Sequence, residues 1–172
     1  MSRDSLEILN AKDSPLLREW LSHVYPLYLH DLSEFDHKFY QLDERGRWEP
    51  DHLQFWLTDE TAHPLVMRTD GNSVGFCFVG KVPFKYMSPG MDYHLAEFFI
   101  LRRFRRMGLG KRAAFAVFDA LPGWWELEEI PANTGAITFW RKVIGEYTNG
   151  NFKEEFVKGV PRQTFYAGKR ST

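Results

Sequence analysis

The segment from Arg105 to Arg112 combines glycine with positive charge in a way that suits an anionic ligand. It reads RRMGLGKR, with Gly108 and Gly110 between two pairs of cationic side chains. Glycine lacks a Cβ, so the backbone can turn sharply and bring several N–H groups close to a ligand. A helix that starts here adds unpaired donors and a partial positive charge. We expect a phosphate-binding turn with pyrophosphate as its natural ligand; a solvated basic turn is the alternative.

A carboxylate, Glu97, begins the apolar segment EFFIL that precedes this turn. On an alternating strand it shares a face with apolar side chains. Those side chains are Tyr93, Leu95, Phe99 and Leu101. We expect this setting to raise the pKa of Glu97 toward neutrality, which suits a general base. A structural ion pair with Arg102 or Arg103 is the alternative, and His94 on the other face has a structural role.

Strand-like and helix-like segments alternate in the part of the chain before Glu97. LEILNA, from residue 6, is strand-like, and a helix follows with Ser14 as its cap and Pro15 in its first turn. We expect Pro26 to end or kink that helix. A short helix fits DHLQFWLTD, and Asp70-Gly71-Asn72 predicts a hairpin between two β-rich runs.

The second half continues with a strand in MDYHLAEFFILRR, the glycine turn and a helix over Lys111–Ala120. WWELEEI is strand-like, NTGAITFWRKVI is helical, and YTNGNFKEEFV and RQTFYAGK are the closing strands. This order predicts an α/β (α+β) fold, with a mixed central sheet of about six to seven strands and helices on both faces. We expect residues 1–172 to form a single domain with its core at about 6–168.

Composition limits the classes of partner. The 22 basic and 23 acidic residues nearly cancel, so no overall field draws the chain to nucleic acid or to an acidic membrane. A single cysteine, Cys77, excludes an internal disulfide and a Cys-x-x-Cys site. The N-terminal segment lacks a signal-peptide core, and no run approaches the ~20 apolar residues of a membrane span. We expect a cytoplasmic protein without a metal, nucleic-acid or membrane partner, and leave a homodimer open.

Two known phosphate-binding patterns fit the glycine turn poorly. A P-loop requires glycine where Arg105 stands, and Ser or Thr where Arg112 follows Lys111. The dinucleotide fingerprint is matched literally by Gly108, Gly110 and Ala113. That fingerprint normally opens a series of βαβ units, whereas here a hairpin precedes it and only 62 residues follow Gly110. A dinucleotide-binding protein stays a minor alternative.

A third pattern, Arg/Gln-x-x-Gly-x-Gly/Ala, is filled by RRMGLG from Arg105 to Gly110. With it the sequence resembles the GNAT N-acetyltransferase superfamily. EFFILRRF resembles the strand before that motif, and NTGAITFW resembles the second family signature, Asn-x-x-Ala-x-x-Phe-Tyr. The resemblance is specific from Glu97 to Ile144 and rests on element order elsewhere. It implies transfer of the acetyl group of acetyl-CoA to a primary amine of a small molecule or peptide, directly in a ternary complex.

The resemblance also implies where acetyl-CoA would bind, and no metal is involved. Its pyrophosphate would lie on the backbone of the turn, which consists of Arg105, Arg106, Met107, Gly108, Leu109, Gly110 and Lys111. The pantetheine arm would pair with Phe99, Ile100 and Leu101, with the Ile100 amide facing the thioester carbonyl as an oxyanion donor. Asn133 and Phe139 on the following helix would contact the cofactor. Asn133 also suits a helix N-cap.

Trp140 departs from the family pattern. It stands where many members have a tyrosine that protonates the leaving thiolate, and an indole N–H does not give up its proton. The catalytic set implied is thus Glu97 and the Ile100 amide, with Trp140 in the tyrosine's place and its role unassigned. The thiolate then leaves unprotonated, or takes a proton from water or from a tyrosine such as Tyr147.

The first helix offers acceptor contacts. Tyr25, Tyr28 and Asp31 could hold a cationic amine by charge and cation–π contact, although a half-buried helix face accounts for the same residues. A non-catalytic acyl-CoA-binding or sensory module of the same fold is the rival function, and Trp140 is the feature that favours it. An RNA-binding protein is disfavoured because aromatic residues do not alternate with the cations of the basic stretch.

Overall fold

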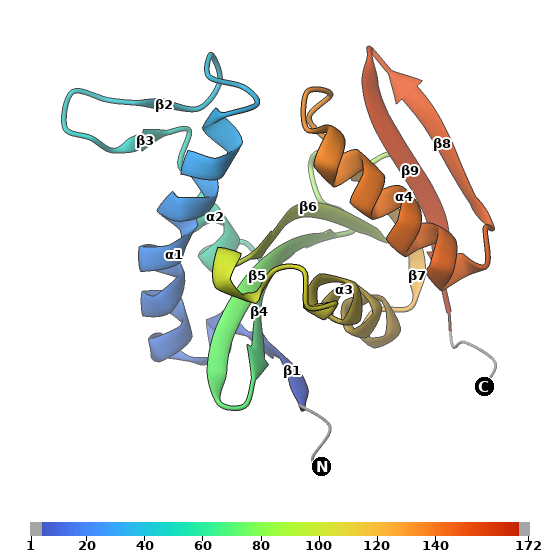
Figure 1. The fold of residues 1–172 in the computed structure, drawn as a ribbon, viewed down its shortest axis with the longest axis horizontal. Coiled ribbons are helices and arrows are strands. Elements are labelled where there is room, and N and C mark those ends of the chain that lie inside the picture. Colours follow the sequence, from blue (N-terminus) through green and yellow to red (C-terminus); the bar gives the residue numbers. More distant parts are fainter. Residues whose placement is uncertain (1–4, 169–172) are drawn as a thin grey trace.

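A seven-stranded sheet forms the centre of the computed structural model, which describes residues 5–168 (Figure 1). Its strands lie in the order β1-β4-β5-β6-β7-β9-β8. Their bounds are β1 Leu6–Asn10, β4 Ala62–Thr69, β5 Asn72–Lys81, β6 Tyr93–Ile100, β7 Gly123–Glu128, β8 Phe152–Val157 and β9 Val160–Ala167. β6 and β7 pair in parallel and the other neighbours are antiparallel. The expected mixed sheet is confirmed; Lys169, in the last predicted strand, lies outside the described residues.

Helices cover both faces of this sheet, as expected. One face carries α1 (Pro15–Ser33) and α2 (Leu53–Thr58), which pack with β-strand side chains into one apolar cluster. The opposite face carries α3 (Leu109–Ala120) and α4 (Thr134–Thr148), which form the other cluster. A small second sheet of β2 (Gln41–Leu42) and β3 (Trp48–Glu49) extends beyond the end of α1 (Figure 1).

The helix α1 begins where the sequence predicts. The Ser14 hydroxyl accepts a hydrogen bond from the N–H of Leu17 at 3.4 Å, and Pro15 is the first helical residue. Of the two outcomes expected at Pro26, the end of the helix is wrong, since α1 continues to Ser33, whereas a kink stays a prediction. Proline costs a helix roughly 3 kcal/mol. The buried side chains after it, Tyr28, Leu29 and Leu32, provide the compensating packing.

The hairpin between β4 and β5 also forms as predicted. Asp70 and Gly71 connect the strands with φ values of 49° and 78°, the left-handed conformations of a two-residue hairpin turn. Cys77, in the middle of β5, is fully buried. Burial raises the pKa of its thiol, so Cys77 is a core residue as the sequence indicates.

A β-bulge in β6 changes which residues share a face with Glu97. In the pairing of β5 with β6, Glu97 lies opposite Phe78 and Leu95 lies opposite Val79, which leaves Ala96 as the extra residue. Leu95 therefore packs with α3 and α4, whereas the residues after the bulge change sides. The prediction that Glu97 shares a face with Tyr93 and Leu95 is wrong, because strict alternation ends at the bulge. Glu97 instead faces α1.

The same region is where β6 separates from β7. The two strands pair only between Tyr93–Leu95 and Trp125–Leu127. Beyond Leu95, the backbone of β6 has β5 on one side and no paired strand on the other. This open edge is the feature of the fold on which the site is built. None of the helices in residues 5–168 has the length and apolar character needed to cross a bilayer.

Candidate active site

A cavity lies where β6 and β7 separate. Its walls come from β6, from the end of β7, from the N-terminal half of α4 and from the α1 side. The lining residues are Tyr28, Leu32, Tyr40, Leu95, Ala96, Glu97, Phe98, Leu127, Glu128, Glu129, Ile130, Asn133, Ala136 and Trp140. Its volume of about 160 Å³ is below the ~300–1,000 Å³ of sites that enclose a whole drug-sized ligand. The cavity therefore suits the reacting ends of two molecules.

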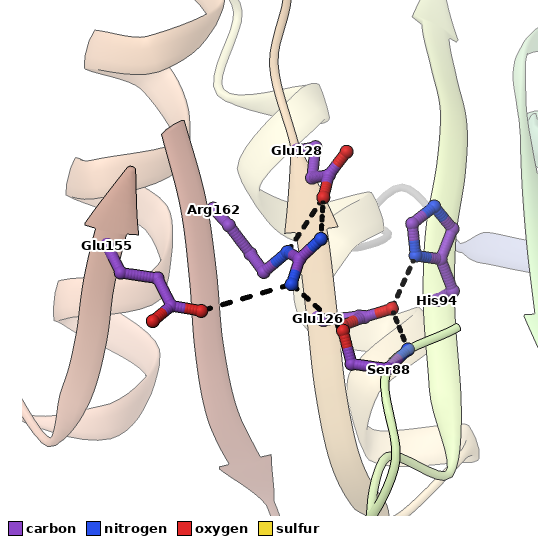
Figure 2. Close-up of polar contacts among 6 residues, drawn as sticks. All are labelled: Ser88, His94, Glu126, Glu128, Glu155 and Arg162. Carbon is purple, nitrogen blue, oxygen red and sulfur yellow. Dashed lines mark hydrogen bonds and ion pairs between the residues drawn. The ribbon is translucent and has the colours of Figure 1, made fainter. Parts of the chain in front are cut away.

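A polar network holds β6 and β7 together at the paired end of this opening. Figure 2 shows His94 of β6 and the backbone of Ser88 directed at Glu126 of β7. The His94 Nδ1 lies 3.0 Å and the Ser88 N lies 2.9 Å from Oε1 of Glu126. Burial acts to raise the pKa of Glu126, but the hydrogen bonds from His94 and Ser88 outweigh it and lower the pKa. His94 is thus structural, as predicted.

Arg162 extends this network to β9. Its Nε donates to Oε1 of Glu128 at 2.7 Å and its Nη1 donates to Oγ of Ser88 at 3.0 Å (Figure 2). Glu155 of β8 lies 3.9 Å from Nη1. These contacts fix the segment before β6 to the sheet, so the two strands are joined at one end and free to diverge at the other.

Glu97 reaches the cavity from the α1 side. Tyr28 of α1 hydrogen-bonds to its carboxylate. Burial raises the pKa of Glu97 to about 7, against the smaller opposing effect of the Tyr28 hydrogen bond. The expected rise of the pKa toward neutrality is confirmed; of the expected neighbours, Phe99 and Leu101 share the face of Glu97, whereas Tyr93 and Leu95 do not. Arg102 is instead paired with Asp31, so the ion pair considered for Glu97 does not form with that residue.

The backbone of Ile100 points toward the open edge. The next peptide N–H, of Leu101, donates to Val74 O of β5 at 2.9 Å. The Ile100 carbonyl across that peptide therefore points away from β5, and in an extended residue the N–H lies on the same side. The Ile100 carbonyl accepts a hydrogen bond from Nε of Arg105 at 2.7 Å. The Ile100 N–H therefore points to the open edge of β6, just beyond Phe98, the last residue of this strand that lines the cavity.

Two arginines of the basic stretch have partners in the protein. Nη2 of Arg102 and Nη2 of Arg105 donate to the two oxygens of Asp31 at 2.7 and 2.8 Å. Partial burial acts to raise the pKa of Asp31, but these hydrogen bonds lower it overall. Asp31, expected at the acceptor site, thus fixes α1 to the end of β6. The Arg105 side chain is engaged in this contact, so it is the backbone of the turn that can donate to a ligand.

α3 directly follows the glycine turn, as the sequence predicts. The helix begins at Leu109, two residues before the expected start at Lys111. Arg106 and Gly108 have φ values of 63° and 75°. The first helical N–H to bond within α3 is that of Arg112, to Gly108 O at 3.2 Å. The N–H groups just before it have no intrahelical acceptor and can donate to an anion. Lys111 pairs with Glu146 at 2.8 Å.

α4 brings three sequence-predicted residues to the site. Oδ1 of Asn133 accepts from the N–H of Ala136 at 3.0 Å, which confirms the N-cap, and Asn133 also lines the cavity. Phe139 covers Gly110, where an added Cβ would lie 3.3 Å from Cζ of the ring. Trp140 is buried and lines the cavity.

Tyr147 is not a proton donor for this cavity. Its hydroxyl donates to Oδ1 of Asp119 at 2.9 Å, and its side chain packs in the core between α4 and the sheet, away from the lining residues. Tyr25, proposed for the acceptor, is also a core residue: it is 1% exposed and its ring packs against Phe76 and Phe78. The structure therefore brings Glu97, Asn133 and Trp140 together, with Tyr28 as their neighbour.

Glu129 lines the cavity and was missed as a site candidate. Tyr40, which the sequence offers as an acceptor contact beside Tyr25 and Tyr28, lines the cavity too. Glu129 follows β7 and continues the alternation of Trp125 and Leu127, both buried. That alternation could have identified Glu129 as an inward-facing carboxylate. Within residues 5–168 no group of three His, Cys, Asp or Glu side chains is arranged to hold a metal ion.

Comparisons with known proteins identify the family of the chain. The sequence profile of the Acetyltransferase (GNAT) family matches residues 16–145. No curated protein sequence matches the chain significantly. The dinucleotide-binding alternative fits poorly, because β6, the strand before the glycine turn, is antiparallel to β5 and joins β7 in parallel over three residues only.

Solved structures share the fold. An acetyltransferase from Thermus thermophilus is 18% identical with a TM-score of 0.62, over 96% of this chain and 99% of that one. Tetrahymena GCN5 is 12% identical with a TM-score of 0.62, over 97% and 98%. Aminoglycoside 6'-acetyltransferase type Ii is 12% identical with a TM-score of 0.61, over 97% and 99%. At these identities the likeness is one of fold.

Proposed function

The chain belongs to the Acetyltransferase (GNAT) family, and we propose that it moves the acetyl group of acetyl-CoA to a primary amine of a small molecule or peptide. The observation that carries the proposal is the position of Glu97. Its carboxyl group, with a pKa of about 7, lines a cavity at the open edge of β6, a few residues before the glycine turn. An acid–base group on β6, a cavity for the reacting groups and a turn suited to an anion thus follow one another along the chain.

The cofactor fits along this line. Its pyrophosphate would lie on the backbone from Arg105 to Lys111, where the start of α3 presents free N–H groups. Its pantetheine arm would lie along Phe99, Ile100 and Leu101, because this edge of β6 has no paired strand. The exposed side chain of Met107 and the ring of Phe139 would flank it. Asn133 would contact the arm with the amide group that its capping oxygen leaves available.

The reaction needs a neutral amine and a polarised thioester. Glu97, ionised near neutral pH, would take a proton from the acceptor ammonium, and Tyr28 would orient its carboxylate. The Ile100 N–H would stabilise the oxyanion that forms on the thioester carbonyl. The acceptor would enter from the α1 side, where Tyr28 and Tyr40 line the cavity and can contact an ammonium group through their rings.

A non-catalytic acyl-CoA-binding module is the second candidate, and the observation that favours it is Trp140. Its indole lines the cavity where a tyrosine proton donor would serve the leaving thiol. Such a module would bind acetyl-CoA tightly and transfer nothing.

A thiol-release assay separates these functions. Acetyl-CoA is offered with a panel of primary amines to the wild type and to Glu97→Gln, with the acetyl-CoA-induced shift in melting temperature measured in parallel. We expect stabilisation of both proteins, and transfer by the wild type to at least one amine that falls about 10²-fold or more in the variant. Stabilisation without transfer to any amine supports the binding module. If acetyl-CoA does not stabilise the wild type, both candidates fail.

A further inference from the structure

Glu129 is a buried carboxylic acid that the proposed reaction does not use. It lies directly after β7, is 5% exposed and lines the same cavity as Glu97. Neither of its carboxyl oxygens forms a hydrogen bond of good geometry with another described residue, although the Gln163 side chain lies close enough to lower its pKa. The neighbouring cation, Arg141, is ion-paired with Glu154, and burying a carboxylate without a counter-charge of its own is costly.

The surroundings of Glu129 favour its protonated form. Burial raises the pKa of Glu129 to about 7, and the charge of Glu154 on β8 acts in the same direction. The Gln163 amide on β9 and Arg141 on α4 oppose this rise. Both are engaged with Glu154, however: Gln163 Nε2 donates to it at 2.7 Å and Arg141 forms a two-pronged ion pair with it. Glu129 is thus left without a counter-charge of its own.

Glu129 and Glu97 reach the cavity from opposite faces of the sheet. Glu129 continues the face of Trp125 and Leu127, which pack against α3 and α4, whereas Glu97 faces Tyr28 of α1. The α4 face is also the side of Asn133 and Trp140, where the proposed cofactor arm would lie. Glu97 therefore lies on the side proposed for the acceptor, and Glu129 lies on the side proposed for the cofactor.

No other residue on the cofactor side, among those that the structure describes, offers an exchangeable proton of suitable acidity. The indole of Trp140 does not release its proton, and Tyr147 donates to Asp119 away from the cavity. The Asn133 side chain is an amide, and the remaining lining residues of α4 and the end of β7 include Ala136, Leu127 and Ile130, which are apolar. Glu128, on the opposite face of β7, is ion-paired with Arg162.

We propose that Glu129 is a catalytic acid that protonates the sulfur of the departing coenzyme A thiolate. This assignment rests on the proposed function, because it concerns the same cavity and reaction. It gives the two carboxyl groups complementary tasks: Glu97 removes a proton from the acceptor nitrogen and Glu129 supplies one to the leaving sulfur.

The neutral amine attacks the thioester carbon, which forms the C–N bond and places negative charge on oxygen and positive charge on nitrogen. When the carbonyl re-forms, the C–S bond breaks and its electron pair goes to sulfur, which takes the proton of Glu129. The nitrogen loses its extra proton to solvent, and the Glu129 carboxylate regains a proton from water. The products are the amide and a neutral thiol.

The first test is the pH dependence of single-turnover transfer. In the wild type we expect the rate to rise as Glu97 ionises and to fall as Glu129 ionises, both near pH 7. Glu129→Gln should be about 10²-fold slower at pH 7 and lose the decrease at high pH. Glu129→Asp should keep that decrease, and the control Glu7→Gln, exposed on the edge strand β1, should match the wild type. A uniform slowing of Glu129→Gln with the wild-type profile would overturn the assignment.

The second test needs no acceptor and no turnover. The thiol of bound coenzyme A is titrated by the ultraviolet absorbance of its thiolate. An ionised Glu129 beside the sulfur opposes thiolate formation, so Glu129→Gln should lower the pKa of the bound thiol by about one unit. An equal thiol pKa in both proteins would show that Glu129 is not beside the sulfur. If coenzyme A does not bind the wild type, the proposed function fails and this inference fails with it. If the wild type transfers the acetyl group, and Glu129→Gln has the same rate, pH profile and thiol pKa, only the role of Glu129 fails.

Discussion

Replacing Glu97 by glutamine tests how strongly the protein holds this carboxyl group in its neutral form. Burial raises the pKa of Glu97 from 4.5 to about 7. A carboxyl group with a higher pKa in the folded chain than in the unfolded chain binds its proton more tightly in the folded state. Its contribution to stability is therefore fully present below pH 4.5 and is lost as the pH rises through 7.

The size of this loss follows from the pKa. One pKa unit corresponds to ~1.4 kcal/mol, so between pH 5 and pH 8 a carboxyl group with these values loses at most about 2.5 kcal/mol. Because Glu97 lines a cavity rather than the closed core, we expect a loss of about 1–2.5 kcal/mol in the wild type. The Glu97→Gln variant has no proton to lose at this position, so it should keep that free energy.

The measurement is urea unfolding followed by tryptophan fluorescence at pH 5 and pH 8, for both proteins. Every other titrating group is common to the two, so its effect cancels when the pH-dependent losses are subtracted. Glu155→Gln, with its side chain 63% exposed, is the control and should lose as much as the wild type. An equal loss in the wild type and in Glu97→Gln would show that burial does not hold Glu97 neutral, because the carboxyl group would then be solvated as in the unfolded chain.

Two further substitutions and one labelling experiment test the elements that support the site. Gly108→Ala should lower the free energy of unfolding in urea by about 1–2 kcal/mol and reduce the stabilisation by acetyl-CoA. The cause is the φ of 75° at this residue, since an added Cβ would meet nothing within 4 Å. Unchanged stability would contradict this prediction. Gly75→Ala should lower the free energy of unfolding by about 2 kcal/mol or more, since the new Cβ would lie 2.2 Å from Phe99 O and displace β6. An unfolding midpoint equal to that of the wild type would contradict this prediction. Cys77 should resist alkylation in the native protein and react once urea unfolds it, because burial raises the pKa of its thiol; fast native labelling would show that β5 opens.

Several elements of the site could be predicted because their causes are local. Ser14 and Asn133 cap their helices through backbone groups three residues away. The φ values at Asp70, Gly71 and Gly108 are those that the residue types favour. The order of these segments was enough to predict a mixed sheet with helices on both faces.

Other features depend on contacts between distant segments. The bulge at Ala96 arises from the pairing of β6 with β5, and it moved Glu97 to the α1 face against strict alternation. Asp31 fits an acceptor site by type, but Arg102 and Arg105, more than seventy residues later, engage both of its oxygens. α1 passes Pro26 because the packing of its later turns outweighs the local cost.

The order of residues is enough to predict a turn suited to an anion and to select Glu97, in the strand before that turn, as a candidate base. Glycine conformation, helix N-termini and charge act over a few residues, so their consequences can be recognised in a short segment. The folded chain was needed to establish that β6 and β7 separate beyond Leu95, and that Glu97 and Glu129 line the cavity between them. The pKa of each carboxyl group depends on the removal of water by segments far apart in the chain, and that removal exists only once the chain has folded.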